Sequence, residues 1–472
     1  MRLKALIVSL VALGISAPLL AAGLYDVEIS SQQDVMRDQM NNIDMFLDQN
    51  QPGGFDQPCG WTCRINVSGW INADAYIANR PPVFLNLSPL ATVPALVANG
   101  NRLLPTAGRA SDLLLNNTNL FIDARVNNWV TANTSLVYSS VTAIPGSQGF
   151  YGIANSLLIY HPVPSGNGVT RNIDTAYATI GNFQASPIYF RVGKEYLPFG
   201  QYEPYAFIQS ENPTQLITEI NATTAQLGFI ARNGFYGSVY TFAGKPQLND
   251  GGSTRRIQNG GADLGYVFAT GDGRINIDAG YIANIADSNF LSSYYTNSLI
   301  EGTSVPGLPN KKTSAYDVNA DVQYGPFDAN AHFVAATSDL MSPLMLGFPN
   351  PAPLLPFPAS LGKPNAWGVE AGYTFPMMSH ESRLAIGYQQ TNHLATLLPK
   401  KRIYADYMVN LSKWLDMGIA LFQDRDYSFQ EGIIALTNLP DGTPVIPPVF
   451  IVGGATGNKS TVGQLRASIK FA

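Results

Sequence analysis

Residues with reactive or metal-binding side chains are few and scattered along this chain of 472 residues. Of the four histidines, His161, His380 and His393 fall in predicted loops or turns, and only His332 lies in a predicted strand. A hydrolase needs a nucleophile, a base and an orienting group within hydrogen-bond reach of one another, and no such triad can be assembled here. The pattern therefore argues against an enzyme and implies neither a catalytic residue nor a cofactor.

The two cysteines, Cys59 and Cys63, are separated by Gly60-Trp61-Thr62. Two thiols without a histidine nearby make a poor metal site, because structural zinc takes four ligands. In an exported protein, a pair this close in sequence favours a small disulfide. We therefore expect a Cys59–Cys63 disulfide and no bound metal.

Charged and polar side chains recur at every second position of many short segments. In residues 274–281, Arg274, Asn276 and Asp278 alternate with Ile275 and Ile277, and residues 65–77, 316–324 and 327–333 read the same way. A period of two puts successive side chains on opposite faces of a β-strand, so each strand has one apolar and one polar face. This is the pattern of a strand whose two faces meet different surroundings.

The segments number about sixteen, and many approach the ten residues that a tilted strand needs to cross a bilayer. Long connections rich in Pro, Gly, Ser and Asn alternate with short turns such as Asn127-Asn128 and Gly325-Pro326. Bacterial outer-membrane barrels have this layout, and an even strand count leaves both ends on the periplasmic side. The predicted strands are 65–78, 113–126, 130–140, 172–182, 187–195, 222–231, 235–243, 260–270, 273–284, 314–324, 327–338, 365–376, 381–391, 401–411, 414–426 and 461–472.

Composition agrees with an all-β transmembrane antiparallel barrel in the bacterial outer membrane. Only 13% of the residues are charged, about half the usual share for a soluble domain, although 46% are apolar. After the N-terminal segment, no uncharged apolar run is long enough for a spanning helix. The net charge of −5 argues against a nucleic-acid partner.

The N-terminal region divides into three parts. Residues 1–22 have a basic start, a short apolar core and small residues near Ala22, as in a secretory signal peptide. Residues 23–58 form a periplasmic lead-in, followed by the barrel over 59–472. Within the lead-in, a seven-residue apolar spacing from Ile29 to Leu47 indicates a short helix or coiled coil that joins subunits, most plausibly as a homotrimer. The alternative is a disordered polar lead-in, because isolated helices this short are marginal in water.

If the apolar strand faces meet lipid, the polar faces line the interior and would contact a passing solute. Side chains of both signs there favour water and small polar solutes. The alternative is that most of these charges pair across neighbouring strands and only stiffen the wall. Lys194 has lipid-side phase but lies near a strand end, where its ammonium can reach water. The candidate lining residues are Tyr189, Arg191, Lys194, Glu195, Arg125, Arg274, Arg383, Asp278, Asp321 and Glu370.

Two long connections have further expected roles. The connection after Gly200 carries Glu203, Glu211 and Glu219, and we expect it to fold inward and narrow the pore. Segment 339–364 is too apolar for a freely solvated loop and too rich in proline for a helix, so we predict an ordered lid. Contact with lipopolysaccharide or a neighbouring subunit would bury the same apolar surface.

Residues 191–200, Arg-Val-Gly-Lys-Glu-Tyr-Leu-Pro-Phe-Gly, run from a predicted strand into a Pro-Phe-Gly loop. This segment resembles the Gly-Lys-x-Tyr-x-Pro-Phe-Gly stretch of LbtU-like siderophore porins, the group of the Legionella legiobactin receptor. The N-terminal helix, the cysteine pair and the barrel length also fit that family. The resemblance implies a sixteen-stranded outer-membrane barrel, without a plug domain, that takes up a ferric siderophore. A general or anion-selective diffusion porin is the main alternative, followed by a structural or adhesive barrel.

Overall fold

A computed structural model of the chain describes residues 65–80, 108–127, 129–139, 170–183, 185–200, 213–244, 257–270, 273–289, 291, 312–346, 355–360, 362–394, 398–428, 431, 433–438, 444–452 and 459–471. The signal peptide, the lead-in helix and both cysteines lie outside these residues, so those expectations stay predictions. Within the described part, no helix is long and apolar enough to cross a bilayer.

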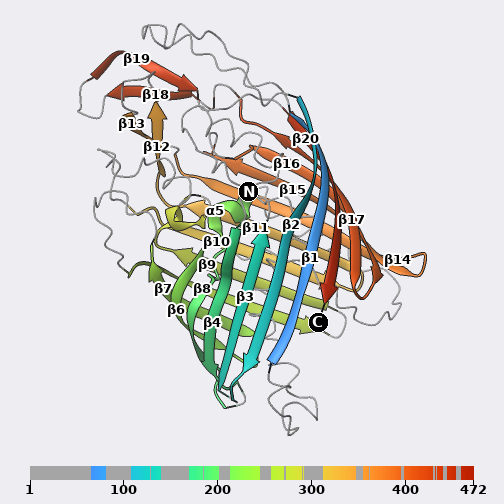
Figure 1. Cartoon of the computed structure of the whole chain (residues 1–472). Coiled ribbons are helices and arrows are strands. Elements are labelled where there is room, and N and C mark those ends of the chain that lie inside the picture. Colours follow the sequence, from blue (N-terminus) through green and yellow to red (C-terminus); the bar gives the residue numbers. More distant parts are fainter. Residues whose placement is uncertain are drawn as a thin grey trace.

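Sixteen strands of the described part form one closed antiparallel barrel in which each strand pairs with its neighbours in chain order (Figure 1). The last strand, β20, pairs with β1 and closes the ring. The predicted fold class is therefore confirmed, with strand bounds shifted by a few residues. The barrel strands are β1 (Ile65–Arg80), β2 (Gly108–Arg125), β3 (Val130–Ser139), β4 (Thr170–Gly181), β5 (Ile188–Tyr196), β6 (Asn221–Ile230), β7 (Phe235–Ala243), β8 (Ile257–Thr270), β9 (Gly273–Ile282), β10 (Ala315–Tyr324), β11 (Phe327–Ala336), β14 (Asn365–Met377), β15 (His380–Asn392), β16 (Lys401–Ser412), β17 (Leu415–Arg425) and β20 (Lys459–Phe471).

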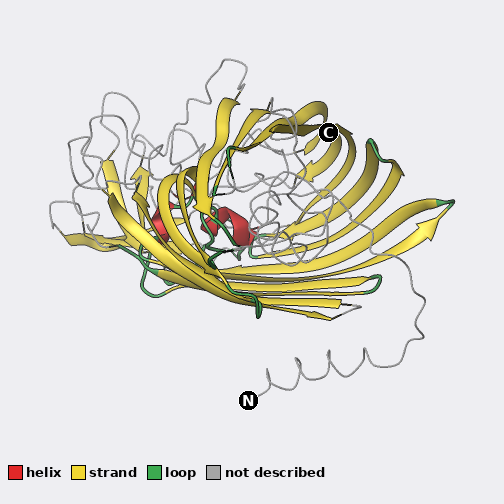
Figure 2. Ribbon diagram, turned by 90° about the horizontal axis from the view of Figure 1, so that it is seen from below, coloured by secondary structure: helices red, strands yellow, loops and turns green. Residues whose placement is uncertain are grey.

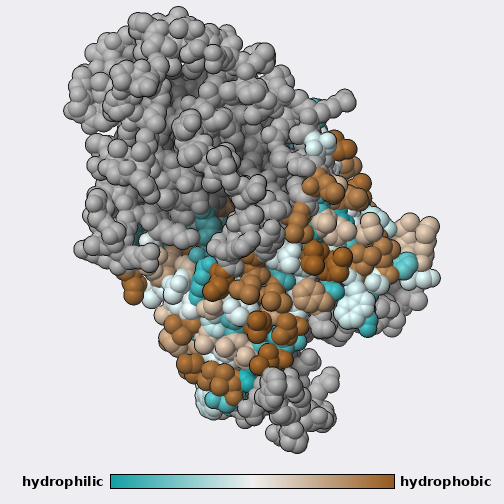
Figure 3. All heavy atoms as spheres, in the orientation of Figure 1, coloured by the Kyte–Doolittle hydropathy of each residue, from teal (hydrophilic) through white to brown (hydrophobic). Residues whose placement is uncertain are grey.

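Burial follows the two-residue alternation, with polar side chains inside and apolar ones outside. On β9, Ile275 and Ile277 are 38% and 51% exposed, whereas Asn276 and Asp278 between them are buried. A soluble protein would show the opposite, because water favours exposed polar groups. Apolar residues form much of the visible outer face of the described strands, with paler and hydrophilic residues between them (Figure 3). A closed barrel with this exterior satisfies its backbone hydrogen bonds within lipid, so the protein resides in the outer membrane.

Short turns join the strands at one end of the barrel, and long connections join them at the other. Gly234 (φ 91°) and Gly325 (φ 54°) lie in two of the short turns, where a left-handed backbone is needed. Gly69, near the start of β1, pairs with Phe471 at the end of β20, so both ends of the barrel sequence lie on the short-turn side. In bacterial barrels this side is periplasmic, and the long connections face outward from the cell.

Aromatic side chains lie on the outer face near both ends of the strands. Trp367 packs against Tyr388 toward the outer end, with ring centroids 5.2 Å apart. Phe327 packs against Tyr373 at the periplasmic end, with centroids 4.8 Å apart. These positions match the interfacial girdles of a transmembrane barrel.

Two long outer connections contain small hairpins that the alternation did not reveal. β12 (Met341–Leu346) pairs with β13 (Leu355–Ser360), and β18 (Ile433–Asn438) pairs with β19 (Pro444–Val452). In the first hairpin, Pro343 lies opposite Pro358. Proline lacks a backbone N–H but is tolerated here, because each strand of a two-stranded sheet is an edge strand. Segment 339–364 is therefore partly regular, and its role as a lid stays a prediction.

Candidate functional site: the polar wall of the barrel interior

A short helix, α5 (Pro213–Thr218), lies inside the ring of strands (Figure 2). It follows β5 and precedes β6 in the chain, yet it contacts β11, β14 and β15. Pro213 opens the helix, where its missing N–H leaves no intrahelical bond unmade. The Thr214 hydroxyl and His332 Nε2 on β11 are 2.7 Å apart. The described end of the connection after Gly200, residues 213–220, therefore lies inside the barrel, and His332 is a hydrogen-bonding wall residue.

An apolar cluster holds this connection near the outer ends of the strands. Ile217 of α5 and Ile220 after it are fully buried against inward-facing residues such as Ile282 and Val334. Burying one such side chain contributes about 1.5–3 kcal/mol. Asn289, beyond the 3₁₀ helix η3 (Ile285–Asp287), adds a polar tie, because its side chain donates to the Glu219 carboxylate at 3.0 Å. The inner helix is therefore fixed to the wall rather than suspended in the lumen.

Arg191 is buried inside the barrel at the segment that carries the family resemblance. Its Nη1 is 3.1 Å from Glu195 Oε2, and its Nε donates to Thr179 Oγ1 at 3.0 Å. The guanidinium carbon lies 4.8 Å from the Tyr177 ring centroid and 5.6 Å from that of Tyr189. The structure thus brings Tyr189, Arg191 and Glu195 together on the inner face, and Arg191 has the ion pair that a structural role requires.

The strands from β11 onward through β20 to β1 carry cations paired with carboxylates. The pairs are Arg383 with Asp328 and Glu370, Arg402 with Asp424, Arg466 with Asp74, and Lys470 with Asp416. We call these strands the paired sector.

One pair of the paired sector skips a strand. Arg383 on β15 reaches over β14 to Asp328 on β11, with Nη2 2.6 Å from Oδ1. Gly372 on β14 makes this possible, since a Cβ there would be 2.3 Å from Arg383 Nη2. Tyr404 donates to Glu370 and completes the network. Most charges of this sector therefore neutralise one another.

The strands β8, β9 and β10 carry a different set, which we call the acidic sector: Asp263, Asp278 and Asp317. Asp263 and Asp317 both lie opposite Gly280 of β9, and a Cβ at Gly280 would be 2.2 Å from Asp317 Oδ1. Asn319 Nδ2 donates to Asp278 and to Asp317, each at 2.7 Å. Ser238 donates to Asp263. Among the described residues, these three carboxylates have neutral hydrogen-bond partners and no ion pair.

The remaining predicted residues lie at the periphery or beside the acidic sector. Asp321 is buried on β10, two residues from Asn319 toward the periplasm. Arg125 and Arg274 are half-buried at the periplasmic ends of β2 and β9. Lys194 has the predicted lipid-side phase, and its Nζ donates to the Ile173 carbonyl at 2.5 Å. These four do not join Arg191 and Glu195 in one cluster.

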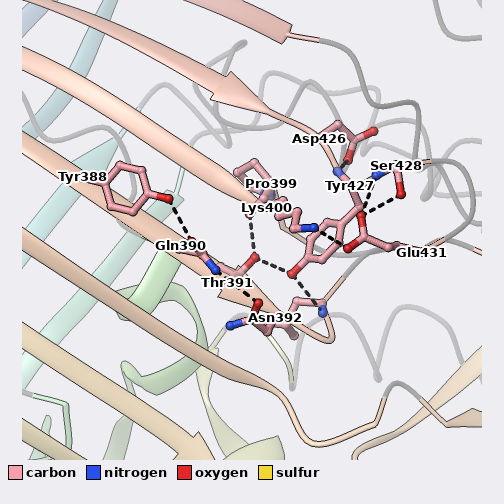
Figure 4. Close-up of polar contacts among 11 residues, drawn as sticks. Tyr388, Gln390, Thr391, Asn392, Pro399, Lys400, Asp426, Tyr427, Ser428 and Glu431 are labelled. Carbon is pink, nitrogen blue, oxygen red and sulfur yellow. Dashed lines mark hydrogen bonds and ion pairs between the residues drawn. The ribbon is translucent and has the colours of Figure 1, made fainter. Parts of the chain in front are cut away.

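A polar network ties the connection between β15 and β16 to the segment after β17 at the outer end (Figure 4). The Tyr427 hydroxyl lies 2.7 Å from Thr391 Oγ1, which donates to the Pro399 carbonyl at 2.7 Å. Lys400 forms an ion pair with Glu431, and its Nζ lies 5.8 Å from the Tyr427 ring centroid. The network orders these connections where they leave the barrel.

The Glu431 carboxylate accepts several hydrogen bonds at one side of this network. Its Oε2 accepts hydrogen bonds from the Ser428 amide at 3.0 Å and from the Ser428 hydroxyl at 2.8 Å. The hydrogen bond from Lys400, together with those from Ser428, lowers the pKa of Glu431 to about 2. The carboxylate therefore stays charged, and committed to Lys400, at any physiological pH.

Sequence reasoning missed several members of the wall. Arg402, Asp328, Asp416 and Asp424 were not singled out, although Arg402 shares the inward phase of Asp406 in a predicted strand. The alternation contained that signal. Their pairing was not predictable, because it depends on the register between strands. Among the described residues, no group of three or more His, Cys, Asp or Glu side chains is arranged to hold a metal ion.

The closed barrel, its apolar exterior, its polar interior and the helix folded inward define an outer-membrane barrel of the porin type. No protein-family model matches the chain. A UPF0422 protein of Legionella pneumophila (strain Philadelphia 1) is 27% identical over 370 residues, covering 75% of this chain and 61% of that protein. A UPF0422 protein of Coxiella burnetii is 26% identical over 365 residues, covering 76% and 70%. The chain thus spans about three fifths of the Legionella relative.

Solved structures with a similar overall arrangement are outer-membrane channels. The DcaP channel of Acinetobacter baumannii superposes with a TM-score of 0.47 at 11% identity, covering 86% of this chain and 97% of that one. The anion-selective porin from Comamonas acidovorans gives 0.44 at 13% identity, covering 86% and 99%. These identities and TM-scores are too low to assign the substrate of either channel to this chain. The assignment to the class of outer-membrane barrels rests on the strand order and the surface of this protein.

Proposed function

We propose that this barrel is a diffusion channel for small polar solutes that favours cations. The observation that carries the proposal is the acidic sector, where Asp263, Asp278 and Asp317 lie on three neighbouring strands with neutral hydrogen-bond partners. In the paired sector, by contrast, the inward-facing arginines Arg383, Arg402 and Arg466 are each matched by a carboxylate. Unneutralised carboxylates beside low-dielectric walls attract cations and repel anions.

The geometry of the acidic sector strengthens its field. Gly280 has no side chain to separate Asp263 from Asp317, and Asn319 bridges Asp317 to Asp278. Three carboxyl groups are therefore held on one patch of wall. Because the attraction between charges falls with distance and with the surrounding dielectric, a clustered patch inside a barrel acts more strongly than scattered surface charges.

Reversal potentials in a salt gradient across planar bilayers test this proposal. The wild-type channel should be cation-selective, and Asp263→Asn/Asp278→Asn/Asp317→Asn should lower the cation-to-anion permeability ratio roughly tenfold, equivalent to about 1.4 kcal/mol of lost attraction. The control Arg402→Gln/Asp424→Asn removes one buried charge of each sign and should leave the ratio unchanged. A barrel that does not conduct, an anion-selective wild type, or an unaltered ratio in the folded triple variant would contradict the proposal.

We further propose a specific solute for this channel, a ferric siderophore. It is supported by the resemblance of residues 191–200 to LbtU-like siderophore porins. The acidic sector adds a constraint, because it favours a ferric complex of neutral or positive net charge over a negative one. An anion-preferring nutrient porin fits this wall less well.

The identity of the transported solute can be tested by measuring iron uptake. The cells should have this barrel as their only entry route for the ferric siderophore. A positively charged ferric siderophore should enter faster than a negatively charged one, and the triple Asp→Asn variant should narrow the difference. If neither complex enters faster than in cells without the barrel, the siderophore proposal fails, while bilayer conductance still decides whether the protein is a channel.

A further inference from the structure

Three basic residues form one row on the lipid-facing side, at the outer ends of adjacent strands. Lys401 is the first residue of β16, Arg425 is the last of β17, and Lys459 is the first of β20. Lys401 lies directly opposite Arg425, and Arg425 lies directly opposite Lys459. Arg425 and Lys459 are exposed, and Lys401 is half-buried. We call these three residues the basic row.

Within the described residues, nothing on the protein neutralises the basic row. The outward faces of β15, β16, β17, β20 and β1 carry no acidic side chain among the described residues. Asp74, Asp406, Asp416 and Asp424 point inward and are buried, and Glu381, in phase with the inward Arg383, lies at the opposite, periplasmic end of β15. Lys400, next to Lys401 in the sequence, has its own partner in Glu431 (Figure 4). Like charges directly opposite each other in a sheet repel, so an anion from outside the chain would stabilise the basic row.

The surface beneath the row changes in a fixed order toward the periplasm. The next outward positions on β17 and β20 are Gln423 and Thr461, whose side chains hydrogen-bond at 3.4 Å. Below them lie aliphatic side chains, including Leu421 (58% exposed) and Leu465 (46% exposed). The order is cations, then an amide and a hydroxyl, then hydrocarbon. A lipid with phosphates, a sugar and acyl chains has the complementary order.

Three other strands differ at the outer rim. On β9, β10 and β14, the corresponding outward positions carry the aromatic residues Tyr281, Tyr316 and Trp367. Such side chains suit an interface without a specific headgroup. The basic row is therefore a local feature of β16, β17 and β20, which lie side by side (Figure 1).

We propose that the basic row binds the phosphate groups of a lipopolysaccharide molecule in the outer leaflet, with its acyl chains against the aliphatic face below. Arg425 presents a planar fork that matches two phosphate oxygens, and the lysines on either side add point charges. An acidic protein surface would match the charges but not the hydrocarbon face directly beneath them. The site is independent of what passes through the lumen.

Binding of purified bisphosphorylated lipid A to the full-length barrel in detergent, measured by native mass spectrometry, tests the proposal. Lys401→Gln/Arg425→Gln/Lys459→Gln should weaken binding roughly hundredfold, since each cation near an anionic headgroup contributes about a fivefold factor. Lys400→Gln removes the same unit of charge from the neighbouring residue and should leave affinity unchanged. Arg425→Gln alone, which keeps both flanking cations, should weaken binding about fivefold and serves if the triple variant fails to fold.

Two further ligands identify the group that is bound. Dephosphorylated lipid A should bind the wild type as weakly as bisphosphorylated lipid A binds the triple variant. Inorganic phosphate at millimolar concentration should not displace the bisphosphorylated lipid, because it lacks the acyl chains. The proposal is overturned if the folded row variants bind as tightly as the wild type, if Lys400→Gln loses as much affinity, or if the phosphates make no difference.

Discussion

Arg383 and Asp317 both face the barrel interior, yet their surroundings give them different roles. Arg383 has Asp328 at 2.6 Å and Glu370 at 3.5 Å, so carboxylates of the wall neutralise its charge. Asp317 accepts a hydrogen bond from the neutral Asn319 amide at 2.7 Å and has no cation as a partner among the described residues. Inward phase alone therefore does not make a residue a selectivity determinant. The partner that each side chain meets decides whether its charge is neutralised.

Gly193 provides a test of local strain in the resemblance segment. Its φ of 141° is one that other residues rarely adopt, and a Cβ there would be 2.4 Å from the Tyr177 Cα. Gly193→Ala should therefore cost about 1–3 kcal/mol of barrel stability. On gels of samples heated to increasing temperatures, the variant should shift from the migration of the folded barrel to that of the unfolded chain at a lower temperature. Gly463→Ala is the matched control, because its Cβ would meet only Leu421 at an ordinary 3.4 Å. Equal midpoints for the two variants would contradict the strain argument.

At this scale, the sequence predicted which side chains face inward but not which ones meet. The alternation placed Tyr189, Arg191 and Glu195 on one inner face, and the structure agrees. It gave no hint that Arg383 would reach across β14 to Asp328, because that contact needs both the register of three strands and the space left by Gly372. Side-chain pairing in a sheet is set by register, and register is a property of several strands together.

Among the elements, the barrel strands were predictable and the elements in the long connections were not. A strand with one face toward lipid shows a strict period of two, which is visible within a single segment. The hairpin β12–β13 has prolines at paired positions and no such period, so it read as an irregular loop. The helix α5 is too short to show a helical period, although the inward fold of its connection was expected.

The inner helix offers a prediction about pore size. Ile217 is fully buried among apolar residues of the wall, and replacing Ile with Ala at such a site costs about 2–5 kcal/mol. Ile217→Ala should loosen α5, speed hydrogen exchange in residues 213–220 and raise the single-channel conductance. Ile277→Ala on the lipid face, where the side chain is 51% exposed, removes the same atoms and should change neither. Slow exchange and unchanged conductance in a folded Ile217→Ala barrel would show that α5 does not narrow the pore.

For the whole molecule, we predict that the lead-in of residues 26–50 joins subunits into a trimer. Its seven-residue apolar spacing, from Ile29 through Met36 to Ile43, suits a coiled coil. Deleting residues 26–50 should leave folded monomeric barrels, as measured by light scattering in detergent. Leu85→Ser/Leu87→Ser, in the long connection after β1, is a matched change outside the lead-in and should leave the trimer intact. A wild-type monomer, or a trimer that survives the deletion, would reject the assembly role.

The seam between β1 and β20 determines which step of barrel assembly comes last. Asp74 and Arg466, which form two hydrogen bonds across it at 2.8 and 2.9 Å, are 392 residues apart in the chain. Every other neighbouring pair of barrel strands is consecutive along the chain of barrel strands and is joined by one connection. The ring closes only when β20, the last barrel strand, pairs with β1. Until then the sheet has two open edges that invite pairing with other chains, so the time spent before closure is the interval in which a chaperone or the insertion machinery has to protect it.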